Sequence, residues 1–150
     1  NVRRQLVGIA RPAYVPIYAQ ALAELGVDRA MIVSGDEGLD ELSLDGGNDM
    51  AEVKGNALVA MHRLHGSDLD LPSRPVSAIR GGDAAHNAAA LRALLQGEQS
   101  AYRDAVLLNA AVALVVADAA ADLREGMEEA AETIDRGLAN ALLNCWIAYS

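Results

Sequence analysis

Six carboxylate side chains lie between Asp36 and Asp49, directly after the apolar run 30–33, and two of them, Asp40 and Glu41, are adjacent. Carboxylate oxygens are hard ligands of the kind that Mg²⁺ prefers. A protein-bound Mg²⁺ usually takes one or two carboxylates and completes its shell with water and phosphate oxygens. Asp40 and Glu41 are therefore candidate ligands for a Mg²⁺ ion that carries a diphosphate.

Two glycines, Gly35 and Gly38, precede the pair. Glycine lets the backbone turn sharply or approach a ligand closely. The same composition also describes an ordinary solvated acidic loop, because Asp and Gly are common turn formers. Glycines beside an acidic pair are not a specific motif. The residues alone leave both interpretations open.

The acidic segment follows the second strand of a predicted strand–helix–strand unit. Residues 5–10 and 29–33 are apolar runs of strand length, and apolar residues between 14 and 25 recur at the three- and four-residue steps of a helix. Such units form parallel sheets, whose ligand sites lie beyond the carboxyl ends of the strands. Residues 34–41 leave the second strand at that end.

A β-hairpin and three helices are expected after the acidic segment. Gly55-Asn56 separates two strand-like runs and favours a hairpin turn. Helices are predicted over residues 84–95, 100–122 and 123–146. The expected fold class is α/β: a partial domain with a mainly parallel sheet and flanking helices, in the order strand–helix–strand, hairpin, three helices.

The composition limits the classes of partner. The 150 residues suit one domain, and 52% of them are hydrophobic, enough for a core. A net charge of −9 argues against nucleic acid or an anionic membrane as a partner. The single cysteine, Cys145, can form neither an internal disulfide nor a CxxC zinc site, which fits a cytoplasmic protein. Beside Trp146, it is expected to be packed rather than reactive.

Four other polar features allow a ligand but are explained as well by structure. The segment 80–83 (RGGD) could cradle an anion at a helix start, but the Asp83 carboxylate suits an N-cap better. Asn109, inside an apolar helix, is expected to bond a neighbouring loop backbone. His62 and His65 lack a third metal ligand. Arg3 and Arg4 could meet phosphate or lie at a solvated strand edge.

Four segments of the chain occur together in a recognisable order. They are VRRQLVGIARPAYV, VDRAMIVSGDEGLDELSL, AIRGGDAAHNAAALRALLQGE and YRDAVLLNAAVALVVADAAADLREGMEEAAETIDRG. In combination they resemble the C-terminal half of the anthranilate phosphoribosyltransferase family, over nearly the whole chain.

The resemblance implies a reaction and a cofactor. Members of the family transfer phosphoribose from phosphoribosyl pyrophosphate to the amino group of anthranilate and release pyrophosphate, in tryptophan biosynthesis. Their Asp-Glu pair helps to bind the Mg²⁺ that accompanies the pyrophosphate, and here that pair is Asp40 and Glu41. The resemblance also implies a homodimer whose contacts lie in an N-terminal helical domain.

The chain departs from the family pattern in two respects. Many members carry a histidine after the last valine of the strand, where this chain has Ser34. The family's helical domain, its glycine-rich and basic loops and its anthranilate-binding arginine would all precede Asn1. Residues 1–150 are thus expected to be the C-terminal portion of the α/β domain and to be inactive alone.

Two other functions fit the same residues. A pyrimidine nucleoside phosphorylase relative would share the fold, although the segment 38–41 (GLDE) favours the transferase. A noncatalytic packing or binding module would retain the family core without activity.

Overall fold

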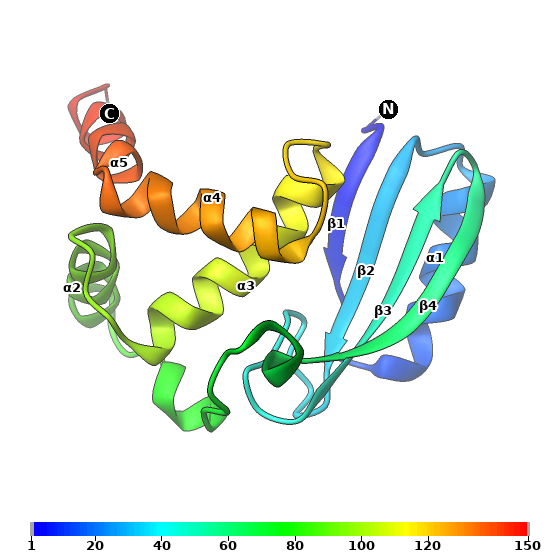
Figure 1. Cartoon of the computed structure of the whole chain (residues 1–150), viewed down its shortest axis with the longest axis horizontal. Helices are drawn as coiled ribbons and strands as arrows, with labels where there is room; N and C mark the ends of the chain where they lie inside the picture. The colour runs from blue at the N-terminus through cyan, green and yellow to red at the C-terminus, as the bar shows by residue number, and fades with distance from the viewer. Residues whose placement is uncertain (1, 150) are drawn as a thin grey trace.

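The computed structural model describes residues 2–149 (Figure 1). One four-stranded sheet has the order β1-β2-β3-β4. Its strands are β1 (Arg4–Gly8), β2 (Arg29–Gly35), β3 (Gly47–Lys54) and β4 (Ala57–His65). The α-helices are α1 (Val15–Glu24), α2 (Ala84–Leu95), α3 (Ala101–Val116), α4 (Leu123–Asp135) and α5 (Leu138–Tyr149). Three short 3₁₀ helices are η1 (Pro12–Tyr14), η2 (Gly66–Leu69) and η3 (Val76–Ile79).

The α/β class and the hairpin are confirmed, but the expectation of a mainly parallel sheet is wrong. Only β1 and β2 pair in parallel, whereas β2–β3 and β3–β4 are antiparallel. The reason lies in the connections. A helix returns the chain from β1 to β2, while the loop of residues 36–46 is too short for a crossover helix and turns the chain straight back.

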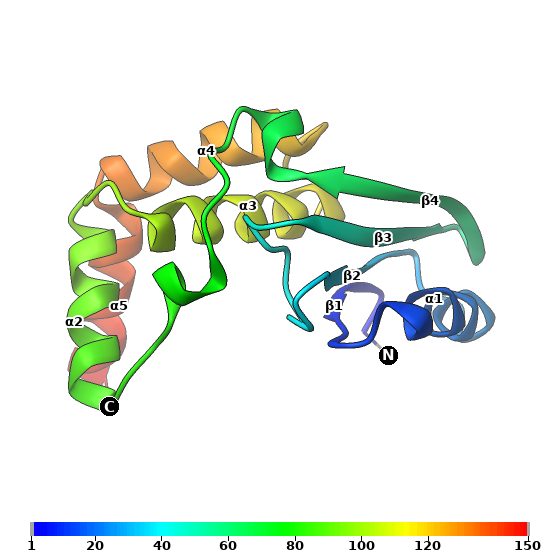
Figure 2. The same cartoon turned by 90° about the horizontal axis from the view of Figure 1, so that it is seen from below.

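The sheet has a helix on each face (Figures 1 and 2). On one face, α1 packs against β2, β3 and β4, with Val15, Ala19 and Ile32 fully buried. On the other face, α3 covers β1 and β2 through Leu108 and Val112. Both views show α2 and α5 lying beyond the β1 edge of the sheet. The helical layer is therefore wider than the described strands.

Within residues 2–149, four α-helices follow the hairpin where three were expected. The segment predicted as one helix over 123–146 divides into α4 and α5 at Gly137, which has a φ of +73°. A positive φ is ordinary for glycine and ends a helix. Helix α3 ends at Val116 rather than at Asp122, which instead caps α4 by accepting a hydrogen bond from the Glu125 N–H.

The break also explains a wrong prediction about the chain's end. Cys145 was expected to be packed, but it is exposed, and Trp146 is 69% exposed. Helix α5 leaves α4 in a new direction after Gly137, so these side chains do not continue the buried stripe. Among residues 2–149, no helix has the length and hydrophobicity that a membrane span would require.

The loop of residues 36–46 is closed at its base by Asp36. The Asp36 N–H donates to the Gly47 carbonyl at 3.0 Å, and the Gly47 N–H donates to Asp36 Oδ2 at 2.9 Å. Arg63 of β4 forms an ion pair with Asp36 and a second with Asp49 at 3.0 Å. The bond from Arg63, with the Gly47 N–H second, holds the pKa of Asp36 below its ordinary value.

Helices α3 and α4 cross where Gly126 meets Ala111. A Cβ atom on Gly126 would lie 2.9 Å from the Cα and the carbonyl oxygen of Ala111. Contacts that short involve backbone atoms, so the helices would have to separate.

We expect Gly126→Ala to destabilise the protein despite alanine's higher helix propensity. Overpacking a buried contact costs roughly 1–3 kcal/mol, whereas the propensity gain is about 1 kcal/mol. The urea midpoint should fall. Glu129→Ala, on the exposed face of the same helix, is the matched control. A midpoint that rises for Gly126→Ala would show that the crossing has room for a methyl group.

The Asp36 ion pair predicts a specific acid sensitivity. Because the folded pKa is lowered, the carboxylate contributes stability that is present above its ordinary pKa of about 4 and lost as pH falls below it. Asp36→Asn should therefore lower the melting temperature at pH 7, and by progressively less as the pH falls below about 4. Glu37→Gln removes a neighbouring carboxylate without breaking an ion pair and should leave the pH profile unchanged. Parallel profiles for the wild type and Asp36→Asn would contradict this account.

Candidate functional site

Asp40 and Glu41 lie on the loop that follows β2, at the sheet edge where the parallel strands β1 and β2 both end. Both residues are exposed and line a cavity of about 510 Å³. The other walls of the cavity are the ends of β1 and β2, the 3₁₀ helix η3 and one side of α3. The position at the carboxyl ends of the strands is the one predicted from the sequence.

The six carboxylates of this segment divide into two groups. Asp36 and Asp49 bind Arg63, and Asp45 accepts a hydrogen bond from Ser73. Within residues 2–149, the side chains of Glu37, Asp40 and Glu41 form no hydrogen bond or ion pair. Part of the negative charge is thus structural, and the adjacent pair keeps its oxygen atoms available for a ligand.

Gly8 sets the position of Asp40. A Cβ atom built on Gly8 would lie 1.5 Å from the carbonyl oxygen of Asp40, which is an impossible contact. The end of β1 therefore touches the backbone of the acidic pair directly. Gly35 is similarly close to the other residue of the pair, since its Cβ would lie 3.1 Å from the Glu41 carbonyl oxygen.

Asn109 of α3 binds the backbone immediately after the pair. Its Oδ1 accepts a hydrogen bond from the Leu42 N–H at 2.8 Å, and its Nδ2 donates to the Leu42 carbonyl at 2.9 Å. The prediction that Asn109 bonds to a neighbouring loop backbone is confirmed. Its side chain also lines the cavity that contains Asp40 and Glu41.

Asn48 fixes the rest of the loop, a role that the sequence analysis did not detect. The side chain is fully buried, accepts a hydrogen bond from the Ser43 N–H at 2.6 Å and donates to the carbonyls of Ser43 and Leu64. In the sequence Asn48 lies between Gly47 and Asp49, a composition typical of an exposed turn. The local sequence therefore contains no signal of its burial.

The donor set fits Mg²⁺ better than a metal held wholly by protein. Residues 2–149 contain no group of three or more His, Cys, Asp or Glu side chains arranged to hold a metal ion. Two adjacent carboxylates with free oxygens match the one or two that Mg²⁺ takes when water and phosphate supply the remaining ligands. A diphosphate-bearing substrate would provide those remaining oxygens.

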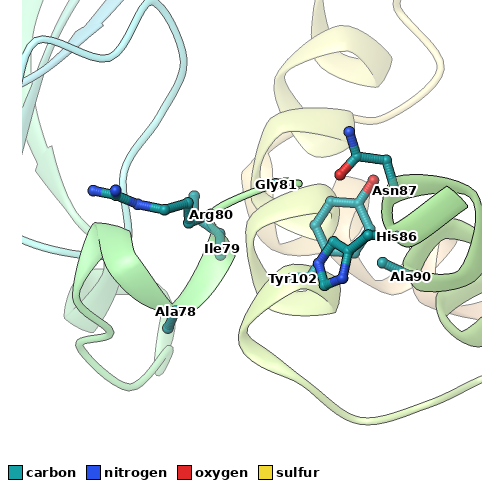
Figure 3. Close-up of a pocket in the computed structure, with 8 residues that line it drawn as sticks. All are labelled: Ala78, Ile79, Arg80, Gly81, His86, Asn87, Ala90 and Tyr102. Carbon is teal, nitrogen blue, oxygen red and sulfur yellow. The ribbon is translucent and has the colours of Figure 1, made fainter. Parts of the chain in front are cut away.

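A second cavity, of about 390 Å³, lies between η3 and the start of α2 and shares Ile79 and Tyr102 with the first (Figure 3). Arg80 extends away from His86 and Tyr102, so the two basic side chains do not converge on one point. The Asp83 carboxylate accepts a hydrogen bond from the His86 N–H at 2.8 Å. The segment 80–83 is therefore the turn and helix cap that was predicted.

The remaining candidates lie away from the acidic pair. Arg3 pairs with Asp28, and Arg4 pairs with Asp118 and donates to the Val116 carbonyl. Both arginines are at the opposite end of β1 from Gly8. His65 contacts the Gly46 carbonyl at 3.2 Å through its Nδ1 atom.

Comparisons with known proteins agree on one family. A model described as glycosyl transferase family, a/b domain, matches residues 1–140. The anthranilate phosphoribosyltransferase of Novosphingobium aromaticivorans is 67% identical over 148 residues, which are 99% of this chain and 44% of that protein. The corresponding enzyme of Rhodopseudomonas palustris (strain TIE-1) is 44% identical over 150 residues, the whole chain and 44% of that protein.

Two solved structures share the fold. Anthranilate phosphoribosyltransferase from Thermus thermophilus has a TM-score of 0.84 at 35% identity, over 95% of this chain and 41% of that one. The Saccharomyces cerevisiae enzyme in complex with PRPP and Mg has a TM-score of 0.82 at 26% identity, over 93% and 40%. The chain thus spans less than half the length of the relatives that it matches.

The resemblance drawn from the four sequence segments is confirmed. Since the family model covers 140 of 150 residues, the chain belongs to the glycosyl transferase family, within its a/b domain.

Proposed function

We propose that this chain is the C-terminal portion of the α/β domain of an anthranilate phosphoribosyltransferase. The whole enzyme would transfer phosphoribose from phosphoribosyl pyrophosphate to anthranilate, giving N-(5-phosphoribosyl)anthranilate and pyrophosphate in tryptophan biosynthesis. Asp40 and Glu41 would hold the Mg²⁺ that accompanies the pyrophosphate. The names of the similar proteins support this reaction, as do yeast complexes with PRPP and Mg and with 4-fluoroanthranilate.

One observation carries the proposal: two adjacent carboxylates, without side-chain partners among residues 2–149, lie on a tethered loop at the carboxyl ends of β1 and β2. Bound Mg²⁺ would stabilise the negative charge that develops on pyrophosphate as it leaves. The chain's own contribution is to hold two oxygen-bearing side chains in place before substrate arrives. Contacts at Gly8 and Leu42 fix the backbone, so little ordering is needed on binding.

The shape of the chain supports a larger domain. Strand β1 pairs only with β2 in the described part of the chain, so its other edge is open. Helices α2, α3 and α4 line an open apolar hollow of about 460 Å³. We infer that preceding residues supply strands that pair with β1 and pack on these helices, together with the phosphoribosyl- and anthranilate-binding loops. The helical domain that would precede them would also carry the homodimer contact.

We place the whole enzyme in the cytoplasm. Cys145 is a free, exposed thiol, and a reducing compartment keeps such thiols reduced. The acidic net charge of −9 again disfavours nucleic acid and anionic membranes as partners.

The proposed function predicts metal binding by the chain itself. Calorimetric titration with Mg²⁺ and pyrophosphate should show affinity at least about tenfold weaker in the double variant Asp40→Asn/Glu41→Gln, because the adjacent free carboxylate oxygens are lost. Glu37→Gln is the control, since it removes an unpaired carboxylate of the same loop that does not line the cavity. Equal binding by wild type and double variant would favour a noncatalytic module instead.

The second prediction concerns catalysis. A chimera in which residues 1–150 replace the matching part of the Novosphingobium aromaticivorans relative should consume anthranilate in the presence of PRPP. The double variant should lower kcat/KM on the order of 100-fold through lost charge stabilisation. The 150-residue chain alone should show no turnover. Phosphorolysis of thymidine by the chimera, without use of anthranilate, would identify the nucleoside phosphorylase reaction and refute the proposed one.

A further inference from the structure

We propose that Asn109 is a positioning residue for the Asp40–Glu41 pair, acting through the backbone of Leu42. The inference rests on the proposed role of the pair as metal ligands. It adds a residue of α3, 68 positions after Glu41 in the chain, to the machinery that determines where the carboxylates lie.

The bond between Asn109 and Leu42 is reciprocal. Oδ1 accepts from the Leu42 N–H at 2.8 Å, and Nδ2 donates to the Leu42 carbonyl at 2.9 Å. Only one orientation of the amide satisfies both bonds, because an N–H must donate and a carbonyl must accept. The side chain therefore forms the same pair of hydrogen bonds with the Leu42 backbone that a neighbouring strand would form.

Asn109 is itself held firmly. The second Nδ2 proton donates to the Ala105 carbonyl of the preceding helical turn at 3.0 Å. The neighbouring residues Leu108 and Val112 are fully buried against the sheet. Helix α3 thus supplies a rigid support, which fixes the position of Leu42 relative to the protein core.

The geometry makes Asn109 a support rather than a ligand of the cation. Both amide protons are engaged and Oδ1 already accepts one bond, although the residue borders the same cavity as Asp40 and Glu41. Its influence must pass through the peptide that joins Glu41 to Leu42.

The acidic pair is therefore bracketed from both sides. Before it, the Asp40 carbonyl rests against Gly8 at the end of β1. After it, Leu42 is 1% exposed and bonded to Asn109. The base of the loop at Asp36 and Gly47 is closed separately. Loss of the Asn109 bonds should thus release the carboxylates while the loop stays attached at its base.

The test uses Asn109→Leu and Asn109→Ala. Leucine removes both bonds while keeping a side chain of similar volume, whereas alanine also leaves a space. Both variants should therefore weaken binding of Mg²⁺ with pyrophosphate to the 150-residue chain by roughly tenfold, the size seen when supporting residues of metal sites are changed. A defect in Asn109→Ala alone would assign the effect to packing and overturn the proposal.

Two further readouts separate positioning from general instability. Hydrogen exchange of the Leu42 amide should accelerate more than about tenfold in Asn109→Leu, while other amides of β2 remain protected. In the chimeric enzyme, Asn109→Leu should raise the Mg²⁺ concentration needed for half-maximal rate, and excess Mg²⁺ should restore kcat. Glu129→Ala, on the exposed face of α4, should change neither quantity.

The outcomes distinguish this inference from the function on which it rests. If the double variant Asp40→Asn/Glu41→Gln loses metal binding but Asn109→Leu retains the wild-type affinity, the proposed function stands and the positioning role is refuted. If the double variant binds the metal as the wild type does, both are refuted.

Discussion

The described part of the molecule depends on one constraint: an acidic loop takes its shape from hydrogen bonds to one buried and one half-buried asparagine side chain. Leu42 is bonded by Asn109 of α3, and Ser43 by Asn48 of β3. Ordering a loop of this length costs backbone conformational entropy, which amounts to about 1–2 kcal/mol of free energy for each ordered residue. The two asparagines offset part of that cost, and the carboxylates of Asp40 and Glu41 take no part in holding the loop.

The sequence was a good guide where local chemistry decides the structure. The Asp83 cap, the turn at Gly55-Asn56 and the backbone partner of Asn109 all follow from residue type and position. It failed on the direction of strand pairing. Strand β2 is apolar and buried on both faces, which is typical of parallel sheets. Burial alone, however, does not show whether a neighbouring strand runs parallel or antiparallel. A lone glycine at 137 was likewise insufficient to predict the break between α4 and α5, because glycine is tolerated within helices.

The same limit of sequence-based prediction applies to site residues whose partners are distant in the sequence. Family resemblance led to the proposal of Asp40 and Glu41 as metal ligands, whereas spacing alone did not separate them from Asp36, Asp45 and Asp49. That separation comes from Arg63, which reaches back to Asp36 from a strand 27 residues later. Partners brought together by the fold determine which acids are structural, and a linear pattern contains no information about them.

Gly8 shows that solvent accessibility and tolerance to substitution are different properties. The residue is exposed and ends a short strand, so a stability screen guided by accessibility would replace it with a β-branched residue. Any such side chain would occupy the space of the Asp40 carbonyl. The first cost would be the geometry of the acidic pair rather than the folding of the sheet. An engineered protein could thus keep its sheet and, through the same replacement, lose the cation affinity that we propose for Asp40 and Glu41.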